Sequence, residues 1–482
     1  MYCVGFADTL STIFTAFAFL SASNGSSRII PAIFCVLSSL SKESGFVSFA
    51  IVLLVRLLNN PMRFTSFRSE LLLCILAPLV RYWYVGGSPV NFAYADVPYI
   101  YEPESYVRGF SYLHVHSIYG RLLVLPWNMS WDYSFDAVPL VRTFFDLRML
   151  GSVATYLAVT GLGYMSLRKR LLGILAFSLF VLPFIPVSSL FLAVGTVVGE
   201  RLLYPVSFGL ATVLALQASS CEGQKNLLRV CVCLCGAYVW LSWVRVNVWS
   251  SKLSLYSTDA KAWPRSCKTL HQYGAVLMNT GPGGLDAALP VLLESLRIFD
   301  DNALTDYLIS QIYIEKGDFD SAIGVHNKIA AGHGIGFTDF SRFMFLVDAG
   351  YVLVADGRYG YEYPANLIEE GLEIYPYVSH ARNAVAVAYM RQAQYGKAIE
   401  HLETAVMLEQ TPSQRSEKIW LNLVVAYALN GDEEKSMDAL SHAIEIGKVI
   451  RGSISPVVVE NINWMNGESK SPSFSLFYTR MT

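Results

Sequence analysis

The sequence predicts an all-α protein with a polytopic membrane half and a second half made of helical repeats. Three observations lead to this prediction. Of the 482 residues, 53% are hydrophobic and only 15% are charged, whereas about a quarter of the residues in ordinary soluble domains are charged. Long apolar runs follow one another up to residue 246. Beyond that point the composition becomes that of soluble helices, and alanine-centred patterns recur.

Residues 1–246 are predicted to form the membrane domain, because a helix needs about 20 apolar residues to cross the hydrocarbon core. The second run is interrupted at Ser41–Ser44, where a helix break is expected. The chain has roughly seven to nine spans, depending on how this run and residues 112–125 are counted. The runs are Cys3–Ala22, Ile29–Leu58, Leu71–Val85, Leu147–Leu167, Leu171–Val187, Leu202–Ala218 and Leu227–Val246.

Basic residues predict the orientation, because Lys and Arg concentrate in cytosolic loops. The run RKR at 168–170 is the strongest basic cluster, and Arg63 and Arg68 mark another. If both clusters face the cytosol, the loop 86–146 and everything after Val246 face the opposite side.

That loop contains one acceptor sequence for N-glycosylation, Asn128-Met129-Ser130. Such a sequence can be used only in a secretory lumen. It therefore agrees with the orientation and makes Asn128 a predicted glycosylation site.

The clearest repeat unit is AVAVAYMRQAQYGKAIEHLETAVMLEQTP, residues 384–412. Its apolar residues follow the spacing of a tetratricopeptide repeat (TPR), a helix-turn-helix unit that buries its apolar face by stacking on its neighbours. The positions that carry this spacing are Ala386, Tyr389, Ala398, Leu402 and Ala405.

Four further units have a small residue where this unit has Ala398. The five key positions are separated by 34, 43, 33 and 38 residues. Two of these separations fit the TPR period of about 34, and two imply insertions or irregular linkers. We therefore expect a linker at 247–266, a TPR α-solenoid at 267–450 and an irregular tail at 451–482. The key residues are Ala288, Ala322, Ala365, Ala398 and Ser436.

Two classes of function are disfavoured. The net charge of −2 and the absence of a long basic run argue against a nucleic-acid partner, because phosphate neutralisation needs clustered Lys and Arg. Metal binding is not expected either. The thiols of Cys231, Cys233 and Cys235 lie in an apolar run without the spacing of zinc knuckles, and His114 and His116 would point to opposite sides of a helix.

The stretch Val198–Gly209 (VGERLLYPVSFG) sets Glu200 and Arg201 side by side between two apolar runs. A charge at mid-bilayer costs at least ~2.5 kcal/mol. The predicted orientation moves the pair to the lumenal interface, where two interpretations stay open. The pair is part of a functional site, or it caps a helix and extends to the headgroups.

Five stretches, in order, resemble the transmembrane and tetratricopeptide-repeat (TMTC) protein O-mannosyltransferases. The last is the most specific, being similar to a pattern with A-E-R-x-L-Y-x-P-S-x-G at its end. The stretches are Val4–Asp8 (VGFAD), Ser41–Gly45 (SKESG), Pro89–Pro98 (PVNFAYADVP), Leu125–Pro139 (LPWNMSWDYSFDAVP) and Pro186–Gly209.

The resemblance implies a GT-C-like membrane domain in the endoplasmic reticulum membrane, with the TPR domain in the lumen. It also implies transfer of mannose from dolichyl phosphate mannose to Ser or Thr of lumenal acceptor polypeptides. No cofactor besides this lipid-linked donor is implied, and the chain shows no G-x-G-x-x-G or P-loop motif. Membrane lipid and acceptor polypeptides are the expected partners, with no nucleic acid.

Within this resemblance, Arg201 is the predicted contact to the donor phosphate, since an Arg can bind a phosphate with two hydrogen bonds. Glu200 is predicted to orient Arg201 or a neighbouring helix. The family's catalytic acids are expected upstream of the V-G-R-A-D stretch, so we expect this chain to be truncated at its N-terminus and leave the catalytic residues unknown.

The remaining acids are weak catalytic candidates. Asp8 and Asp96 match family patterns, although Phe6 stands for the usual Arg and Val97 for the usual Asn. Asp132 is flanked by aromatic residues typical of a membrane-surface belt. Its structural interpretation is a loop carboxylate bonded to nearby backbone N–H groups.

Three other charges are predicted to be structural or to line the site. Lys42 and Glu43 are interpreted as a neutralised pair at the helix break. Arg81 either extends to the headgroups or faces the active-site cavity.

The predicted function is protein O-mannosyl transfer, with the repeats presenting the acceptor. The alternative is an inactive, truncated homologue that acts as a TPR scaffold for protein partners in the endoplasmic reticulum membrane. A transporter is a weaker alternative, because the interrupted inverted repeats of many transporters are absent from the sequence.

Overall fold

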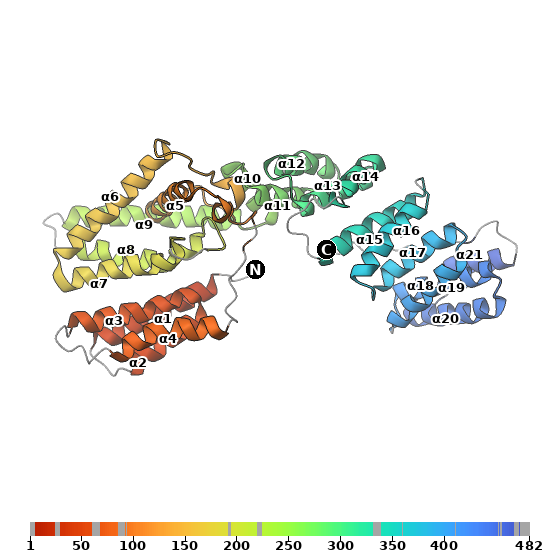
Figure 1. Ribbon diagram of the computed structural model, residues 1–482, viewed down its shortest axis with the longest axis horizontal. Helices are drawn as coiled ribbons and strands as arrows, with labels where there is room; N and C mark the ends of the chain where they lie inside the picture. The colour runs from red at the N-terminus through yellow and green to blue at the C-terminus, as the bar shows by residue number, and fades with distance from the viewer. Residues whose placement is uncertain are drawn as a thin grey trace. The chain divides into compact units, whose positions relative to one another are not determined.

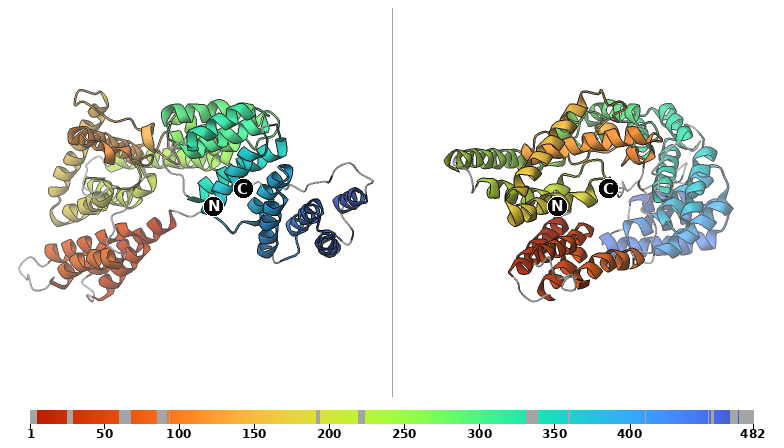
Figure 2. Two further views of the ribbon diagram at one scale, coloured as in Figure 1. Left: turned by 45° about the vertical axis from the view of Figure 1, so that its right-hand side comes forward. Right: turned by 60° about the vertical axis from the view of Figure 1, so that its left-hand side comes forward.

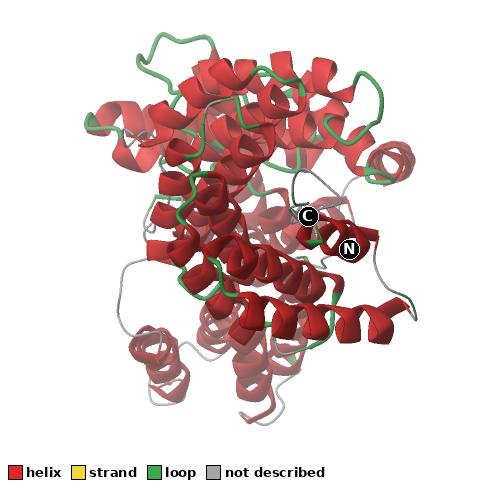
Figure 3. Ribbon diagram, turned by 90° about the vertical axis from the view of Figure 1, so that its right-hand side faces the viewer, coloured by secondary structure: helices red, strands yellow, loops and turns green. Residues whose placement is uncertain are grey.

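The computed structural model describes residues 5–24, 29–59, 68–84, 92, 94–190, 194–218, 224–330, 339–358, 360–409, 411–451, 453, 456–466 and 472. Within these residues the secondary structure is helical, and no strand is drawn (Figure 3). The all-α prediction is confirmed. The chain divides into two compact units, Met1–Asp300 and Asp301–Thr482, which are described separately below.

Unit 1 begins with a group of four helices. The predicted break in the second apolar run is confirmed, because Lys42 is extended and a short 3-10 helix, η1, separates α2 from α3. Gly45 allows this close turn, since a Cβ there would lie 2.2 Å from the Ser38 carbonyl oxygen. The elements are α1 (Phe6–Ser23), α2 (Ile29–Ser41), η1 (Glu43–Phe46), α3 (Val47–Asn59) and α4 (Arg68–Tyr84).

The next helices of unit 1 lie beside one another in Figure 1. An extended loop joins α5 to α6, and α7 continues into the 3-10 helix η5. The elements are η3 (Pro98–Tyr101), α5 (Ser105–Val124), η4 (Phe135–Ala137), α6 (Arg148–Leu167), α7 (Arg170–Val181), η5 (Leu182–Val187), η6 (Glu200–Leu202), α8 (Leu203–Ala218) and α9 (Gln224–Val248).

Five helical segments in the described part of unit 1 are long and apolar enough to cross a membrane. Each corresponds to a run predicted from the sequence, and α2 and α3 are shorter apolar helices. The total number of spans stays a prediction. The five segments are Phe6–Ser23, Arg148–Leu167, Arg170–Val187, Glu200–Ala218 and Cys231–Val248.

Unit 1 ends in three helices that follow α9. The residues predicted as a linker, 247–266, contain a helix, α10, whose N-terminus is capped by the Ser251 side chain accepting from the Ser254 N–H. The structure differs from the prediction here because Leu255 and Asp259 of α10 are buried within the unit. The elements are α10 (Lys252–Ala262), α11 (Cys267–Leu277) and α12 (Gly284–Ile298).

Unit 2 is a series of helix pairs, visible side by side in both views of Figure 2. Each pair consists of two helices that are consecutive in the chain and packed against each other. The elements are α13 (Ala303–Glu315), α14 (Phe319–Ala330), α15 (Asp339–Asp356), α16 (Glu362–Ile374), α17 (Ser379–Arg391), α18 (Tyr395–Leu408), α19 (Gln414–Asn430), α20 (Glu433–Arg451) and α21 (Pro456–Met465).

The predicted repeat positions are confirmed. All five key small residues are buried, and each lies on the second helix of a pair, from α12 through α20. A small side chain lets the two helices approach, and at the fifth position the Ser436 hydroxyl also donates to the Val424 carbonyl oxygen at 3.0 Å. In the unit at 384–412 all five predicted apolar positions are buried.

The segment predicted to be an irregular tail contains the helix α21. This helix packs on α19 and α20, and its Val458 and Asn461 are buried. The structure differs from the prediction because Val458 completes the apolar core that α20 would otherwise leave open at the end of the series.

Asp348 makes unit 2 sensitive to pH. This buried carboxylate on α15 accepts a hydrogen bond from the Tyr307 hydroxyl at 2.5 Å, and burial raises its pKa to about 6. A folded-state pKa above the unfolded value of about 4 means that this group lowers stability as pH rises from 4 to 6. We expect Asp348→Asn to raise the free energy of unfolding of unit 2 by about 2 kcal/mol at pH 7. At pH 4 the substitution is expected to change this free energy little, because the Asp348 carboxyl is already protonated in the folded unit.

Hydrogen exchange of α13–α16 at both pH values, in the wild type and the variant, measures this difference. His326, whose pKa burial lowers to about 4, titrates in the same range but is common to both proteins. An equal difference at pH 4 and pH 7 would show that the Asp348 carboxyl is not the group responsible.

Candidate functional site

Glu200 holds the loop between α5 and α6 in place through two hydrogen bonds. Its Oε1 atom accepts hydrogen bonds from the Ser130 backbone N–H at 2.9 Å and from the Tyr133 hydroxyl at 2.5 Å. Tyr133 is buried, and this burial raises its pKa. The Tyr133 hydroxyl, beside Asp132, is therefore held inside the unit by a carboxylate.

Asp132 has the structural role predicted for it. Its Oδ1 atom accepts from the Ser134 backbone N–H at 2.8 Å, and its own carbonyl oxygen accepts from the Ser130 hydroxyl at 2.8 Å. These bonds within the five residues 130–134 hold the loop in a tight turn. The prediction of a loop carboxylate bonded to nearby backbone is confirmed.

A buried ion pair, which was not predicted from the sequence, also anchors this loop. Asp259 on α10 is fully buried and binds both terminal nitrogens of Arg245 on α9, at 2.6 and 3.1 Å. Its Oδ2 atom also accepts from the Trp131 backbone N–H at 2.8 Å. Arg245, a lone charge near the end of an apolar helix, was the signal that a carboxylate partner had to be near.

Further contacts join this loop region to the residues between α10 and α11. The Trp263 indole N–H donates to the Asn128 carbonyl oxygen at 2.9 Å, and Arg265 forms an ion pair with Asp136. Asn128 itself is exposed, as a glycosylation site must be. Its glycosylation stays a prediction.

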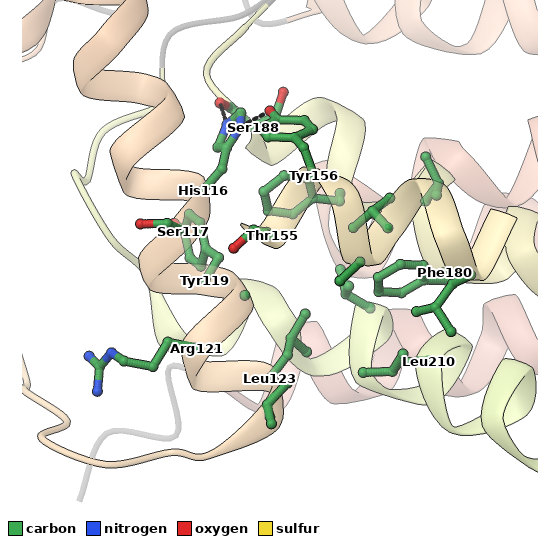
Figure 4. Close-up of a pocket in the computed structure, with 18 of the residues that line it drawn as sticks. His116, Ser117, Tyr119, Arg121, Leu123, Thr155, Tyr156, Phe180, Ser188 and Leu210 are labelled. Atoms are coloured by element: carbon green, nitrogen blue, oxygen red, sulfur yellow. Dashed lines mark hydrogen bonds between the residues drawn. The ribbon is translucent and has the colours of Figure 1, made fainter. Parts of the chain in front are cut away.

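A cavity of about 560 Å³ lies among α5, α6, α7 with η5, and α8. Figure 4 shows Phe180 and Leu210 on its apolar side and His116, Tyr156 and Ser188 together at its polar end. Its size falls in the range of about 300–1,000 Å³ that is usual for ligand pockets.

His116 organises the polar end of the cavity. Its Nε2 lies 2.7 Å from the Ser188 carbonyl oxygen and its Nδ1 lies 2.6 Å from the Tyr156 hydroxyl. A carbonyl oxygen only accepts, so Nε2–H donates to it, and in a neutral ring Nδ1 accepts from Tyr156. The buried histidine therefore joins three elements, and neither nitrogen is left to bind a metal.

Arg201, the predicted donor-phosphate contact, is exposed in η6, just before α8. Its guanidinium makes no ion pair with another described residue. Tyr119, which lines the cavity, accepts from the Gly199 backbone N–H at 2.9 Å. Burial raises the pKa of Tyr119 to about 12, and the nearby Arg201 charge acts in the opposite direction. Arg201 is thus an available cation close to one wall of the cavity.

The loop, α5 and most of α6 also carry the match to known proteins. Residues 86–160 match the family model described as "Protein O-mannosyl-transferase TMTC, DUF1736". In these residues the chain resembles the TMTC family. The matched residues include the loop between α5 and α6 and cavity-lining residues of both helices. The family match therefore covers part of the site described above.

Three curated TMTC relatives show the extent of the similarity. Protein O-mannosyl-transferase F38B6.6 of Caenorhabditis elegans is 26% identical over 58% of this chain and 40% of its own length. Mouse TMTC1 is 31% identical over 42% of this chain and 22% of its own length. Human TMTC4 is 26% identical over 42% of this chain and 28% of its own length. The matches thus span less than half the length of each of these relatives.

Among solved structures, the chain is similar to YrrB, "a TPR protein with an unusual peptide-binding site". The identity is 17%, the match covers 40% of this chain and 91% of YrrB, and the TM-score is 0.34.

Three of the predicted site residues of this chain lie apart from the cavity lining. Lys42 Nζ lies 3.8 Å from Oδ2 of the buried Asp8, which brings together two charges that the sequence analysis had assigned to different roles. Lys268 on α11 pairs with Asp96. The side chains of Glu43 and Arg81 lie outside the described residues, so their predicted roles stay predictions.

Proposed function

We propose that this protein is a protein O-mannosyltransferase that moves mannose from dolichyl phosphate mannose to Ser or Thr of lumenal acceptor polypeptides. The proposal includes the endoplasmic reticulum membrane as its location, with the helix pairs presenting the acceptor. The observation that carries it is the apolar cavity among the membrane-type helices, with the available Arg201 beside it. The names of the TMTC relatives support the reaction class.

The chemistry of a lipid-linked donor fits this arrangement. An isoprenoid chain is apolar and gains free energy by contact with side chains such as Phe180 and Leu210. A phosphodiester at the membrane surface needs a cation, and Arg201 offers two parallel N–H donors to it. Because Arg201 has no competing carboxylate among the described residues, its charge is available to the departing phosphate as well as to the bound donor.

The loop held by Glu200 has a supporting role in this proposal. Glu200 and Arg201 are adjacent in η6, and Glu200 is occupied by Ser130 and Tyr133. The carboxylate therefore fixes η6 against the loop, which leaves the neighbouring guanidinium directed elsewhere. We assign Glu200 a positioning role and Arg201 the contact to phosphate. The catalytic base stays unassigned.

The test is transfer of radiolabelled mannose from dolichyl phosphate mannose to acceptor protein, in microsomes that contain the protein expressed from its full gene. A hydrogen bond to a charged group contributes about 1.5–3 kcal/mol, so Arg201→Ala is expected to lower kcat/KM about 10–100-fold. Leu210→Trp, which fills the cavity, is expected to raise KM for the donor. Arg142→Ala is the control, because Arg142 is also exposed and its carboxylate contact is 3.9 Å long.

If mannose transfer is unaffected by Arg201→Ala, the phosphate of the donor does not bind at Arg201. No transfer by a stable, membrane-inserted protein would favour the alternative of a non-catalytic TPR scaffold.

A further inference from the structure

Helix α9 (Gln224–Val248) carries three cysteines that the proposed transfer reaction does not use. Its apolar window begins at Cys231, and none of that 18-residue window is buried within the protein. Cys233 and Cys235 are exposed, Cys231 is half-buried, and all three are free thiols. The thiols therefore lie on the lipid-facing part of the helix, at the point where its apolar surface begins.

This end of α9 is the basic end of the membrane-type helices. In Figure 1 the turn between α6 and α7, the end of α8 and the beginning of α9 lie at the same end of this group. The turn carries Arg168, which is exposed, and Lys169, which is half-buried, and Arg229 is exposed two residues before Cys231. Positive residues concentrate on the cytosolic side, so the three thiols lie at the cytosolic boundary of the bilayer.

The opposite end of α9 has the features of the other membrane surface. Trp243 and Trp249 are exposed there, as aromatic residues at a membrane interface often are. The acidic residues Glu200 and Asp259 and the glycosylation sequence at Asn128 belong to that end as well. Both ends of the helix thus indicate the same orientation.

We propose that Cys231, Cys233 and Cys235 are sites of S-acylation by long-chain fatty acids. Cysteines next to a membrane boundary on the cytosolic side are the typical acceptors of this modification. Residues i and i+4 of a helix share a face, so Cys231 and Cys235 present two thiols to the same strip of lipid. An acyl chain attached there lies along the exposed apolar surface of α9.

The covalent step needs a fatty acyl-coenzyme A, which is present on the cytosolic side. The cysteine sulfur, as thiolate, attacks the acyl carbonyl carbon and forms a new S–C bond. The bond between that carbon and the coenzyme A sulfur breaks, and coenzyme A leaves as a thiol with the proton that the cysteine gave up. One thioester replaces another, so no oxidant or reductant is involved.

The test uses the whole protein, expressed in eukaryotic cells fed with an alkynyl analogue of palmitate. After coupling to a fluorophore, we expect label that hydroxylamine at neutral pH removes. The triple variant Cys231→Ser, Cys233→Ser, Cys235→Ser is expected to carry at least tenfold less of this label than the wild type. Cys221→Ser is the matched control, because Cys221 lies on the same predicted side only ten residues earlier in the chain, and this variant is expected to keep the label.

Mass spectrometry of the α9 peptide from the wild type, with and without hydroxylamine, gives a second result that does not depend on how the variants fold. Acyl groups on these three residues support the proposal. It is overturned if the wild type carries no labile label, if the triple variant keeps the label, or if Cys221→Ser abolishes it. Disulfide-linked dimers through α9 in the untreated membrane would overturn it as well.

Discussion

Replacing Asp259 by alanine is expected to lower the free energy of unfolding of unit 1 by about 3–5 kcal/mol. The Asp259 carboxylate is fully buried, and its partner Arg245 is only 15% exposed. Removing the carboxylate leaves a guanidinium buried without its counter-charge and the Trp131 backbone N–H without its acceptor. Breaking one partner of such a pair costs more than replacing both by apolar groups, because the remaining charge is still desolvated.

Thermal unfolding in a mild detergent measures this effect, with an expected fall in Tm of about 2–4 °C for each kcal/mol. Asp136→Ala is the matched control. Asp136 also pairs with an arginine across the same loop and helix boundary, but Arg265 is 64% exposed, and exposed pairs contribute about 0–1 kcal/mol. Equal losses in the two variants would contradict the argument from burial.

A double variant sharpens the result. Arg245→Met with Asp259→Leu removes both charges and keeps apolar side chains of similar length. If the loss in Asp259→Ala arises from an uncompensated charge, the double variant is expected to recover most of the stability. It is not expected to recover the acceptor for the Trp131 N–H, so the loop should stay more accessible to protease than in the wild type.

The repeats were predictable from the sequence because their signal is local. Ala398, Leu402 and Ala405 lie on one face of a single helix, so their spacing alone places them in a core. The same holds for the helix break at Ser41–Ser44 and for Asp132, whose backbone partner is two residues away. Each of these features depends on residues that are close in the chain.

The anchored loop and the cavity were not predictable in the same way. Glu200 accepts a hydrogen bond from Ser130, which lies 70 residues away in the chain. Nothing in the sequence around either residue indicates that the other is its partner. Tyr133 is an aromatic residue of the kind found at membrane interfaces. Its burial is explained by the hydrogen bond that its hydroxyl donates to the Glu200 carboxylate, which is distant in the sequence. The cavity needs four helices to form its walls, and sequence spacing within one helix says nothing about such a space.

Replacing Gly209 by alanine is the second change with a large expected effect. Gly209 is buried where α8 meets α7, and a Cβ there would lie 2.2 Å from the Leu179 carbonyl oxygen and 2.3 Å from the Phe180 backbone nitrogen. Small residues allow this backbone approach between membrane helices. The atoms in the way belong to the backbone, so the helices must separate, at a cost of about 3 kcal/mol.

The same separation affects the cavity, because Phe180 and Leu210, the residues beside this contact, both line it. We therefore expect Gly209→Ala to lower Tm and to weaken binding of a fluorescent isoprenoid phosphate to the purified protein. Gly161→Ala on α6 is the matched control, since nothing lies within 4 Å of a Cβ at that position. There the helix propensity of alanine is expected to leave stability unchanged or slightly higher.

The two measurements together separate stability from binding. Isoprenoid binding that survives in Gly209→Ala, although Tm falls, would mean that the ligand does not use the wall formed by α7 and α8. A fall in binding with little change in Tm would mean that the helices part without unfolding and that the cavity alone is altered. Only a loss of both, with Gly161→Ala unaffected, agrees with a helix contact that shapes the cavity and stabilises unit 1.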